Sequence, residues 1–265
     1  MPPVLDGFTS FAPGLSEVAE SYDAARYATI AAVERTHFWF RGRNDLIVWA
    51  LGKYFPNARS LLEVGCGTGQ VLESIQTIRP GLRLVGTEIH VRGLGFSRRR
   101  LPETEFLQMD ARAIPFADEF DVVCAFDVIE HVEEDATVLA QLYQACRPGG
   151  GLLLTVPQHR WLWSYKDKFA HHQRRYCRRE LEEKVVDAGF RVVRASSFVS
   201  LLLPLMYVSR VLEREPAQFN SQREFDIRPT LNQVFLALMR AEATLIRRGV
   251  SLPAGGSLLL VAQKT

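Results

Sequence analysis

The sequence predicts an α/β fold in which a doubly wound, mostly parallel sheet is covered by helices. Two observations indicate this fold. Short apolar segments alternate with helical segments from Ser60 onward, and a glycine cluster follows the first of the apolar segments. Such alternation is typical of βαβ units, which build parallel sheets. Because the crossovers between parallel strands are right-handed, ligands are expected at the carboxyl ends of the strands.

The expected strands and helices follow one another in order around the glycine cluster. The strand before the cluster is Leu61–Val64, and the helix after it runs from about Gln70 to Ile78, where a Pro-Gly pair ends it. Further strands are expected at 82–86, 105–108, 120–126, 152–156 and 190–196, with helices at about 133–146 and 179–188.

The two ends of the chain add further elements to this sheet. We expect an aromatic-rich helical cap at 1–57, helices at about 201–213 and 231–248, and a closing strand at 257–262. Thr230 is the expected N-cap of the second of these helices, and Gly249 is the expected stop at its C-terminus.

Composition excludes several classes of protein. A formal net charge of +2 over 265 residues is too close to neutral for a general polyanion binder, so no nucleic-acid partner is expected. The four cysteines form no CxxC pair and have no histidine spacing typical of zinc, so no metal site is expected. The chain begins without a basic and apolar leader, and its longest apolar stretch, 198–208, is too short to span a bilayer. We therefore expect a cytoplasmic protein without a transmembrane segment.

The segment Gly65–Gly69 has a GxGxG pattern at the first strand-to-helix turn. Glycine lets the backbone turn sharply and lets a ligand approach the main-chain N–H groups. Nicotinamide-binding loops have GxGxxG spacing instead, whereas here the third glycine comes one residue earlier and Glu63 precedes the loop. Acids also end the next two strands. Glu88 could accept hydrogen bonds from both hydroxyls of a ribose, and Asp110 with Ala111 could bind an adenine amino group.

These motifs, taken in order, resemble those of class I S-adenosylmethionine-dependent methyltransferases. The most similar branch acts on small molecules and includes quinone-biosynthesis enzymes. The resemblance covers roughly residues 58–198, and its motifs are 61–69 (LLEVGCGTG), Glu88, 108–111 (QMDA), 120–131 (FDVVCAFDVIEH) and 147–150 (RPGG). It implies S-adenosylmethionine as the cofactor and a seven-stranded sheet in which the last strand, 257–262, is antiparallel.

The expected cofactor contacts combine this resemblance with position in the fold. Segment 37–43 resembles the helical cap that closes over the cofactor in related enzymes, where Trp39 could stack and Arg43 could meet the methionyl carboxylate. Phe126, at the tip of the fourth strand, could pack against the adenine or methionyl group. The full set of expected cofactor-binding residues is Trp39, Arg43, Glu63, Gly65, Cys66, Gly67, Gly69, Glu88, Ile89, Asp110, Ala111 and Phe126.

The acceptor is expected beyond the fourth and fifth strands. Methyl transfer from a sulfonium mainly requires alignment of the nucleophile, and a base is needed only when the nucleophile arrives protonated. His131 and His172 are the candidate catalytic bases, although His131 could instead orient the next helix and His172 could lie in a solvated loop. The expected acceptor-binding residues are Asp127, His171, Arg174 and Arg175. The two arginines could pair with a carboxylate or phosphate, or could form an ordinary charged surface.

We interpret the chain as a single methyltransferase domain. Its expected parts are a helical cap (1–57), a cofactor-binding core (58–157), an acceptor-side lid with the end of the core (158–200), a helical insertion (201–250) and the last strand (251–265). The insertion could line an apolar acceptor pocket, form a homodimer interface or contact a membrane surface.

The predicted function is methyl transfer to a small-molecule acceptor, which could be anionic or amphipathic. Oxygen is favoured over nitrogen or carbon as the methylated atom. A nicotinamide-dependent oxidoreductase is one alternative, against which the glycine spacing and Asp110 argue. A non-catalytic module that binds S-adenosylmethionine is another, although none of the motifs is degraded. A protein acceptor is a further alternative.

Overall fold

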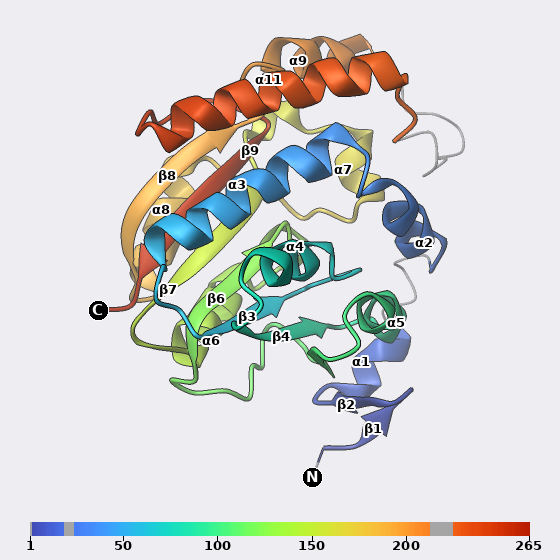
Figure 1. Ribbon diagram of the computed structural model, residues 1–265, viewed down its shortest axis with the longest axis vertical. Helices are drawn as coiled ribbons and strands as arrows, with labels where there is room; N and C mark the ends of the chain where they lie inside the picture. Colours follow the sequence, from blue (N-terminus) through green and yellow to red (C-terminus); the bar gives the residue numbers. More distant parts are fainter. Residues whose placement is uncertain (1, 19–23, 213–224) are drawn as a thin grey trace.

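The computed structural model describes residues 2–18, 24–212 and 225–265, and it places a mixed sheet between two layers of helices (Figure 1). The order across the sheet is β1-β2-β5-β4-β3-β6-β7-β9-β8. The strands are β1 (Val4–Leu5), β2 (Phe8–Ser10), β3 (Ser60–Val64), β4 (Arg83–Glu88), β5 (Glu105–Gln108), β6 (Phe120–Phe126), β7 (Cys146–Pro157), β8 (Arg191–Phe198) and β9 (Ser257–Gln263).

Helices cover both faces of the sheet. The layer on one face contains α3, α4, α5 and α11, and the layer on the other contains α6 and α8. Successive strand residues point to opposite faces, so Leu61 of β3 enters the first layer and Leu62 the second. The helices are α1 (Pro13–Val18), α2 (Ala24–Val33), α3 (Phe38–Tyr54), α4 (Gln70–Ile78), α5 (Val91–Arg100), η2 (Ile129–His131), α6 (Asp135–Ala145), η3 (Arg160–Leu162), α7 (Tyr165–Phe169), α8 (Arg178–Asp187), α9 (Leu203–Leu212) and α11 (Pro229–Arg247).

The five neighbouring strands β5, β4, β3, β6 and β7 are parallel, as the alternation of strands and helices predicts. Strand β9 is antiparallel to both β7 and β8, which confirms the orientation expected of the last strand. Because the carboxyl ends of β3, β4 and β6 meet at one edge, the glycine loop, Glu88 and Asp127 lie at the same edge of the sheet.

The prediction of seven strands is wrong, because nine strands join the sheet within the described residues. The two additional strands, β1 and β2, come from the segment expected to be a helical cap. Strand β2 pairs in parallel with β5, and its Phe8 is buried in the core. The Ser10 hydroxyl donates a 2.6 Å hydrogen bond to the buried side chain of Gln108, whose amide donates to the Ala12 carbonyl at 2.9 Å. This short ribbon covers the edge of β5, which would otherwise present unpaired main chain.

Helix α11 begins two residues earlier than a cap at Thr230 predicts, and its N-cap is Arg228. Pro229 is its first residue, because a fixed φ and a missing N–H suit proline to the first helical turn. Gly249 follows the helix with a φ of +100°, as expected of a terminating glycine. The helix lies along α3 (Figure 1), where a Cβ on Gly42 would come within 2.6 Å of Met239. Glycine therefore permits this close approach of the two helices.

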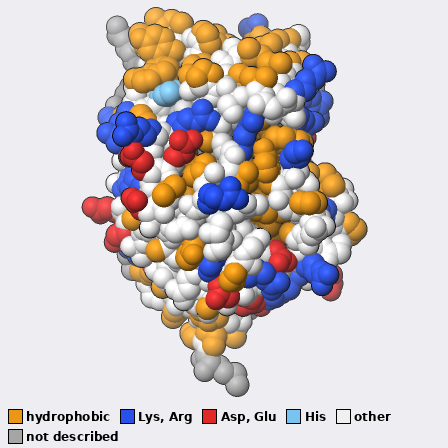
Figure 2. All heavy atoms as spheres, turned by 90° about the vertical axis from the view of Figure 1, so that its left-hand side faces the viewer, with side chains coloured by type: hydrophobic (Ala, Val, Ile, Leu, Met, Phe, Trp, Pro, Cys, Tyr) orange, Lys and Arg blue, Asp and Glu red, His pale blue; other side chains and the backbone are white. Residues whose placement is uncertain are grey.

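The helical insertion contains one packed helix and one exposed helix. The buried apolar residues of α11 are Leu236, Met239, Ala243 and Ile246, whereas α9 has no buried side chain. Apolar side chains accordingly gather at the end of the molecule where α9 and α11 lie (Figure 2). The exposed apolar side chains of this insertion include Leu201, Leu205, Tyr207, Val208, Val211, Leu212, Leu231 and Val234. Within the described ranges, every helix is too short or too polar to cross a bilayer.

Candidate functional site

The glycine loop joins β3 to α4 at the carboxyl edge of the sheet. Gly65, Gly67 and Gly69 have φ values of +72°, +54° and +76°, which residues with a Cβ rarely adopt. A Cβ on Gly65 would lie 2.5 Å from Val128, whereas a Cβ on Gly67 would meet no described atom within 4 Å. Gly65 is therefore required for packing, while the Cα of Gly67 faces open space that a ligand can approach.

Glu88, the last residue of β4, is buried and fixes the glycine loop. Its Oε2 accepts a 3.0 Å hydrogen bond from the N–H of Gly67, and its Oε1 accepts from the N–H groups of Ile89 (2.8 Å) and His90 (3.3 Å). Since a carboxylate oxygen has two acceptor positions, Oε2 keeps one for a further donor. The hydroxyl of Ser97, which was not predicted from sequence, donates to the Gly67 carbonyl at 2.8 Å from the α5 side.

Glu63 is buried beneath the loop, and its Oε2 has no hydrogen-bond partner among the described residues. Burial raises the pKa of Glu63 to about 8 because the charged form loses hydration. The charge of Arg43 opposes this effect and that of Glu88 adds to it. A buried carboxyl group of this kind is a candidate ligand contact, since an incoming donor or cation would satisfy its oxygen.

Arg43 of α3 lies among acidic groups at the strand ends. Its guanidinium pairs with Asp127, which follows β6, and its Cζ lies 4.6 Å from the centroid of the Trp39 ring. Burial dominates the pKa values of Glu63 and Glu130 and raises both, while the charge of Arg43 acts to lower them. The Nε of Arg43 has no partner in the described part of the chain. The structure thus brings the two cap residues predicted as cofactor contacts, Trp39 and Arg43, to the end of β6.

Three of the predicted cofactor contacts are already engaged within the protein. Asp110 accepts hydrogen bonds of 3.0 and 2.9 Å from the Arg112 guanidinium; despite burial, these bonds hold the pKa of Asp110 below its ordinary value. Phe126 is buried in the core, which leaves little of its ring for a ligand. Cys66 is also buried, and burial raises the pKa of its thiol, so its main chain is the part available to a ligand. Ala111, beside Asp110, is half-buried.

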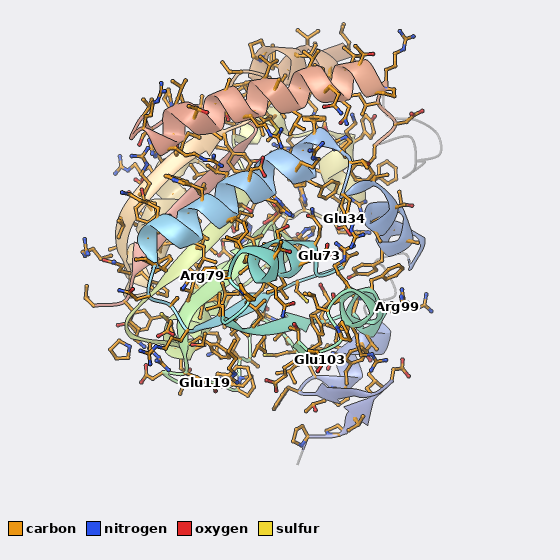
Figure 3. The ribbon with its side chains drawn as sticks, viewed as in Figure 1. Glu34, Glu73, Arg79, Arg99, Glu103 and Glu119 are labelled. Atoms are coloured by element: carbon orange, nitrogen blue, oxygen red, sulfur yellow. The ribbon has the colours of Figure 1, made fainter. Side chains whose placement is uncertain are left out.

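A buried acid that was not predicted from sequence connects the cap to the glycine loop. Glu34, just after α2, accepts a 2.6 Å hydrogen bond from the Thr68 hydroxyl and pairs with Arg100 of α5 at 2.5 Å. Arg100 also pairs with Glu73 of α4 at 3.1 Å, so Glu34 and Glu73 lie close together (Figure 3). The cap is thereby anchored directly at the loop. No local pattern identifies Glu34, because its partners come from distant segments.

The two candidate bases, His131 after β6 and His172 after α7, lie next to each other. The rings of His131 and His172 are in edge-to-face contact, with centroids 4.7 Å apart. Nδ1 of His172 is 2.9 Å from Oδ1 of the buried Asp167, which also accepts a 2.7 Å hydrogen bond from Nε of Arg175. Burial, together with the neighbouring His172, lowers the pKa of His131 to about 3, so its imidazole is neutral. His171, in contrast, is exposed.

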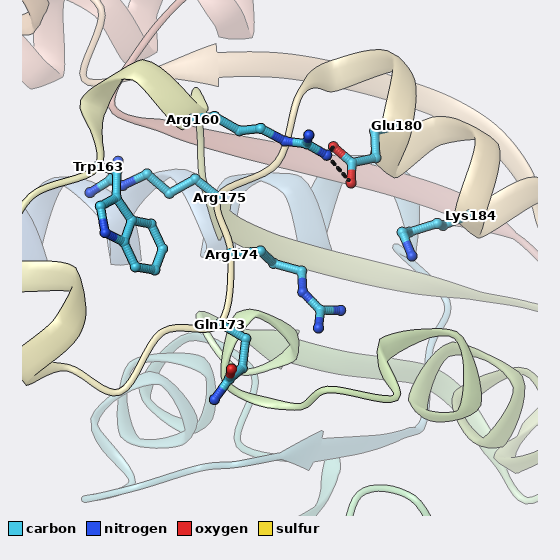
Figure 4. Close-up of a pocket in the computed structure, with 7 residues that line it drawn as sticks. All are labelled: Arg160, Trp163, Gln173, Arg174, Arg175, Glu180 and Lys184. Carbon is cyan, nitrogen blue, oxygen red and sulfur yellow. Dashed lines mark hydrogen bonds and ion pairs between the residues drawn. The ribbon is translucent and has the colours of Figure 1, made fainter.

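The two arginines predicted to bind the acceptor have partners within the protein. Arg174 is 2.9 Å from Asp135, and Arg175 is buried against Asp167. Both line a cavity of about 550 Å³ (Figure 4), across which Arg160 pairs with Glu180. The residues around this cavity are Arg160, Trp163, Gln173, Arg174, Arg175, Glu180 and Lys184. None of these seven is a predicted cofactor contact, so the cavity and the glycine loop are formed by different parts of the chain.

Comparison with known proteins matches these motifs to methyltransferases. A family model described as a methyltransferase domain matches residues 30–195, which include the glycine loop, Glu88 and both candidate bases. A protein of Mycolicibacterium smegmatis, named as an S-adenosylmethionine-dependent methyltransferase, is 28% identical over 167 residues, or 62% of this chain and 63% of that protein. A demethylmenaquinone methyltransferase of Renibacterium salmoninarum is 32% identical over 144 residues, or 54% of this chain and 56% of that protein. The chain thus spans less than two thirds of the length of these curated relatives.

A solved structure shows the same fold. The S-adenosylmethionine-dependent methyltransferase of Thermotoga maritima aligns with a TM-score of 0.55 and 18% identity, and the alignment covers 95% of this chain and 100% of that one. At this level of identity the likeness concerns the arrangement of strands and helices.

Proposed function

We propose, from the premise that the chain belongs to the methyltransferase-domain family as a class I S-adenosylmethionine-dependent enzyme, a specific reaction. In this reaction the protein methylates an oxygen of a small-molecule acceptor. The cofactor would lie along the glycine loop, and the acceptor would lie beside His131 and His172. The family match supports S-adenosylmethionine over a nicotinamide as the cofactor, in agreement with the glycine spacing.

The geometry of the loop supports a specific mode of cofactor binding. The space beside the Gly67 Cα is open, and Oε2 of Glu88 keeps an acceptor position for a ribose hydroxyl. The unpartnered oxygen of Glu63 would accept a hydrogen bond from the methionyl ammonium group. Arg43 and Trp39 would close the methionyl end, where the unpartnered Nε of Arg43 is a donor for the methionyl carboxylate.

The transfer step requires the acceptor oxygen in line with the methyl–sulfur bond. A lone pair on oxygen forms the new O–C bond, the C–S bond breaks, and its electron pair stays on the sulfur of S-adenosylhomocysteine. The hydroxyl proton must leave, and the observation that supports an oxygen acceptor is the Asp167–His172 pair. Asp167 fixes Nδ1 of His172 and leaves its Nε2 as a proton acceptor. His131, which stays neutral, would orient the acceptor.

The test is to incubate the protein with methyl-labelled S-adenosylmethionine and a fractionated extract of the organism that encodes it. We expect the label in a small-molecule fraction, released as a methyl ether or ester. His172→Gln should lose most of this labelling while its affinity for S-adenosylmethionine is unchanged. Label in the protein fraction, or labelling that His172→Gln leaves intact, would refute this choice of acceptor and base.

A further inference from the structure

Glu130, His131 and His172 form a cluster of potential metal ligands. One ligand atom from each residue lies within 4.8 Å of the other two. Glu130 and His131 belong to η2, which begins three residues after the end of β6, whereas His172 follows α7. A 2.7 Å hydrogen bond from the N–H of Gln173 to the Glu130 carbonyl joins the two segments beside the cluster.

Glu130 is the member of the cluster that most needs a ligand. Its side chain is fully buried, and neither carboxyl oxygen has a hydrogen-bond partner among the residues described. A buried polar group without a partner costs about 1–3 kcal/mol, and more when it is charged. The neighbouring cations act on Glu130 only through their charge and donate no hydrogen bond to it, because Arg175 bonds to Asp167 and Arg43 to Asp127.

His172 is supported in a way that is typical of metal-binding histidines. Its Nδ1 is bonded to Asp167, which leaves Nε2 as the nitrogen that can coordinate an ion. Histidine ligands commonly have a carboxylate behind them, which fixes the ring and raises its basicity. Asp167 is itself held by Arg175 at 2.7 Å and by the N–H of Ser164 at 2.9 Å.

We propose that Glu130, His131 and His172 bind a divalent transition-metal cation, such as Zn²⁺, Mn²⁺ or Fe²⁺. Two imidazoles and one carboxylate form a donor set for these ions and leave coordination positions open. With bonds of about 2.1 Å the ligand atoms would lie about 3.0–3.4 Å apart, so the three side chains close in around the ion. The expectation of no metal site came from local cysteine and histidine spacing, which does not detect ligands from two separate segments.

This site would change how the acceptor loses its proton, because Nε2 of His172 cannot accept a proton while it coordinates an ion; that consequence rests on the proposed function. An acceptor hydroxyl in an open coordination position would be acidified by the cation, as metal-bound water is, and its proton would pass to solvent. The acceptor could reach an open position, because His131 and His172 are also the residues proposed to contact it. Binding of the ion itself does not depend on methyl transfer.

The experiment is a titration of Co²⁺ and Zn²⁺ into tag-free protein that has been stripped with EDTA and dialysed. We expect one ion per chain, with visible Co²⁺ absorption and without the charge-transfer band that the exposed Cys177 would produce. Glu130→Gln and His172→Gln should bind at least about 100-fold more weakly, because losing a direct ligand exceeds the 10–100-fold effect of losing an outer partner. Asp167→Asn should fall within that outer-partner range.

His171→Gln is the matched control, since this exposed neighbour should bind the ion as the wild type does. The inference is overturned if the wild type takes up neither ion, or if Glu130→Gln takes up as much as the wild type. Circular dichroism checks the fold of each variant, and His131→Gln replaces any variant that does not fold. S-adenosylmethionine binding is measured on the same samples. Cofactor binding without metal overturns this inference alone, whereas metal binding without cofactor overturns the proposed function alone.

Discussion

Two halves of the same sheet edge are built differently. The glycine-loop half consists of Gly65–Gly69 with Glu63 and Glu88, and its polar groups lie within a few residues of a strand end. The histidine half consists of Glu130 and His131 with segment 167–175. Asp167, His172 and Arg175 pair within this segment, and His172 meets His131 from a distant part of the chain. The first half leaves open space beside the Gly67 Cα. In the second half Asp167, His172 and Arg175 are bound to one another, and Glu130 is buried without a partner among the described residues.

This difference indicates which interactions each half depends on. In the glycine-loop half, backbone conformation and one carboxylate, Glu88, determine where a ligand can be bound. In the histidine half, the position of His172 depends on Asp167, and that of Asp167 depends on Arg175. Substitution of Gly67 or Glu88 should therefore mainly impair ligand binding, whereas loss of the Arg175–Asp167 pair should mainly impair stability.

The largest expected effect is the loss of a buried ion pair in the histidine half. Arg175→Leu leaves Asp167 buried without its guanidinium partner and should cost about 3–5 kcal/mol in the free energy of unfolding, measured with urea. Arg174→Leu should cost only about 1 kcal/mol, because Asp135 keeps Lys184 and Tyr176 as partners. Equal losses in the two variants would contradict a special role for the buried pair.

The second expected effect is that Glu63→Gln, in the glycine-loop half, is more stable than the wild type at high pH. The unfolded carboxyl of Glu63 ionises near pH 4.5 and the native one near pH 8, so the native state loses stability as pH rises between these values. Without cofactor, Glu63→Gln should match the wild type below pH 4.5 and exceed it by a few kcal/mol near pH 8, in denaturation at a series of pH values. Its affinity for S-adenosylmethionine should fall, and an unchanged affinity would assign Glu63 a purely structural role.

The third expected effect separates two glycines of one loop. Gly65→Ala should cost about 2–3 kcal/mol, because it adds a clash with Val128 to the strain of a positive φ. Gly67→Ala has the strain without the clash and should cost about 1 kcal/mol. Its main defect should be weaker cofactor binding, seen by calorimetry at a temperature where both variants are folded. A Gly67→Ala protein that binds the cofactor normally would place the ligand elsewhere.

Most of the sheet could be predicted from sequence because its signals are local. Strands β5 and β6 and helix α4 have the bounds that their apolar patterns predict. The exceptions depend on contacts with distant residues. Strand β2 forms because Ser10 and Phe8 meet Gln108 and the core, and nothing in the first ten residues alone indicates a strand.

The same limit applies to the candidate site. Glu88 and the three loop glycines could be located from their places at strand ends, whereas Arg112, Glu34 and Asp167 could not, because each is defined by a partner. Arg174 and Arg175 illustrate the same limit. The basic composition of their segment predicts a binding surface, but it does not show that Arg174 pairs with the distant Asp135 and Arg175 with the buried Asp167.

The central claim, that S-adenosylmethionine binds at the glycine loop, is tested most directly by calorimetric titration of the cofactor into the wild type and Glu88→Ala. The control is Glu103→Ala, which replaces an exposed acidic residue (Figure 3). We predict one cofactor per chain in the wild type and the control, and binding about 10–100-fold weaker in Glu88→Ala, as the loss of one charged hydrogen-bond acceptor implies. Equal affinity in all three proteins, or no binding in the wild type, would contradict the account.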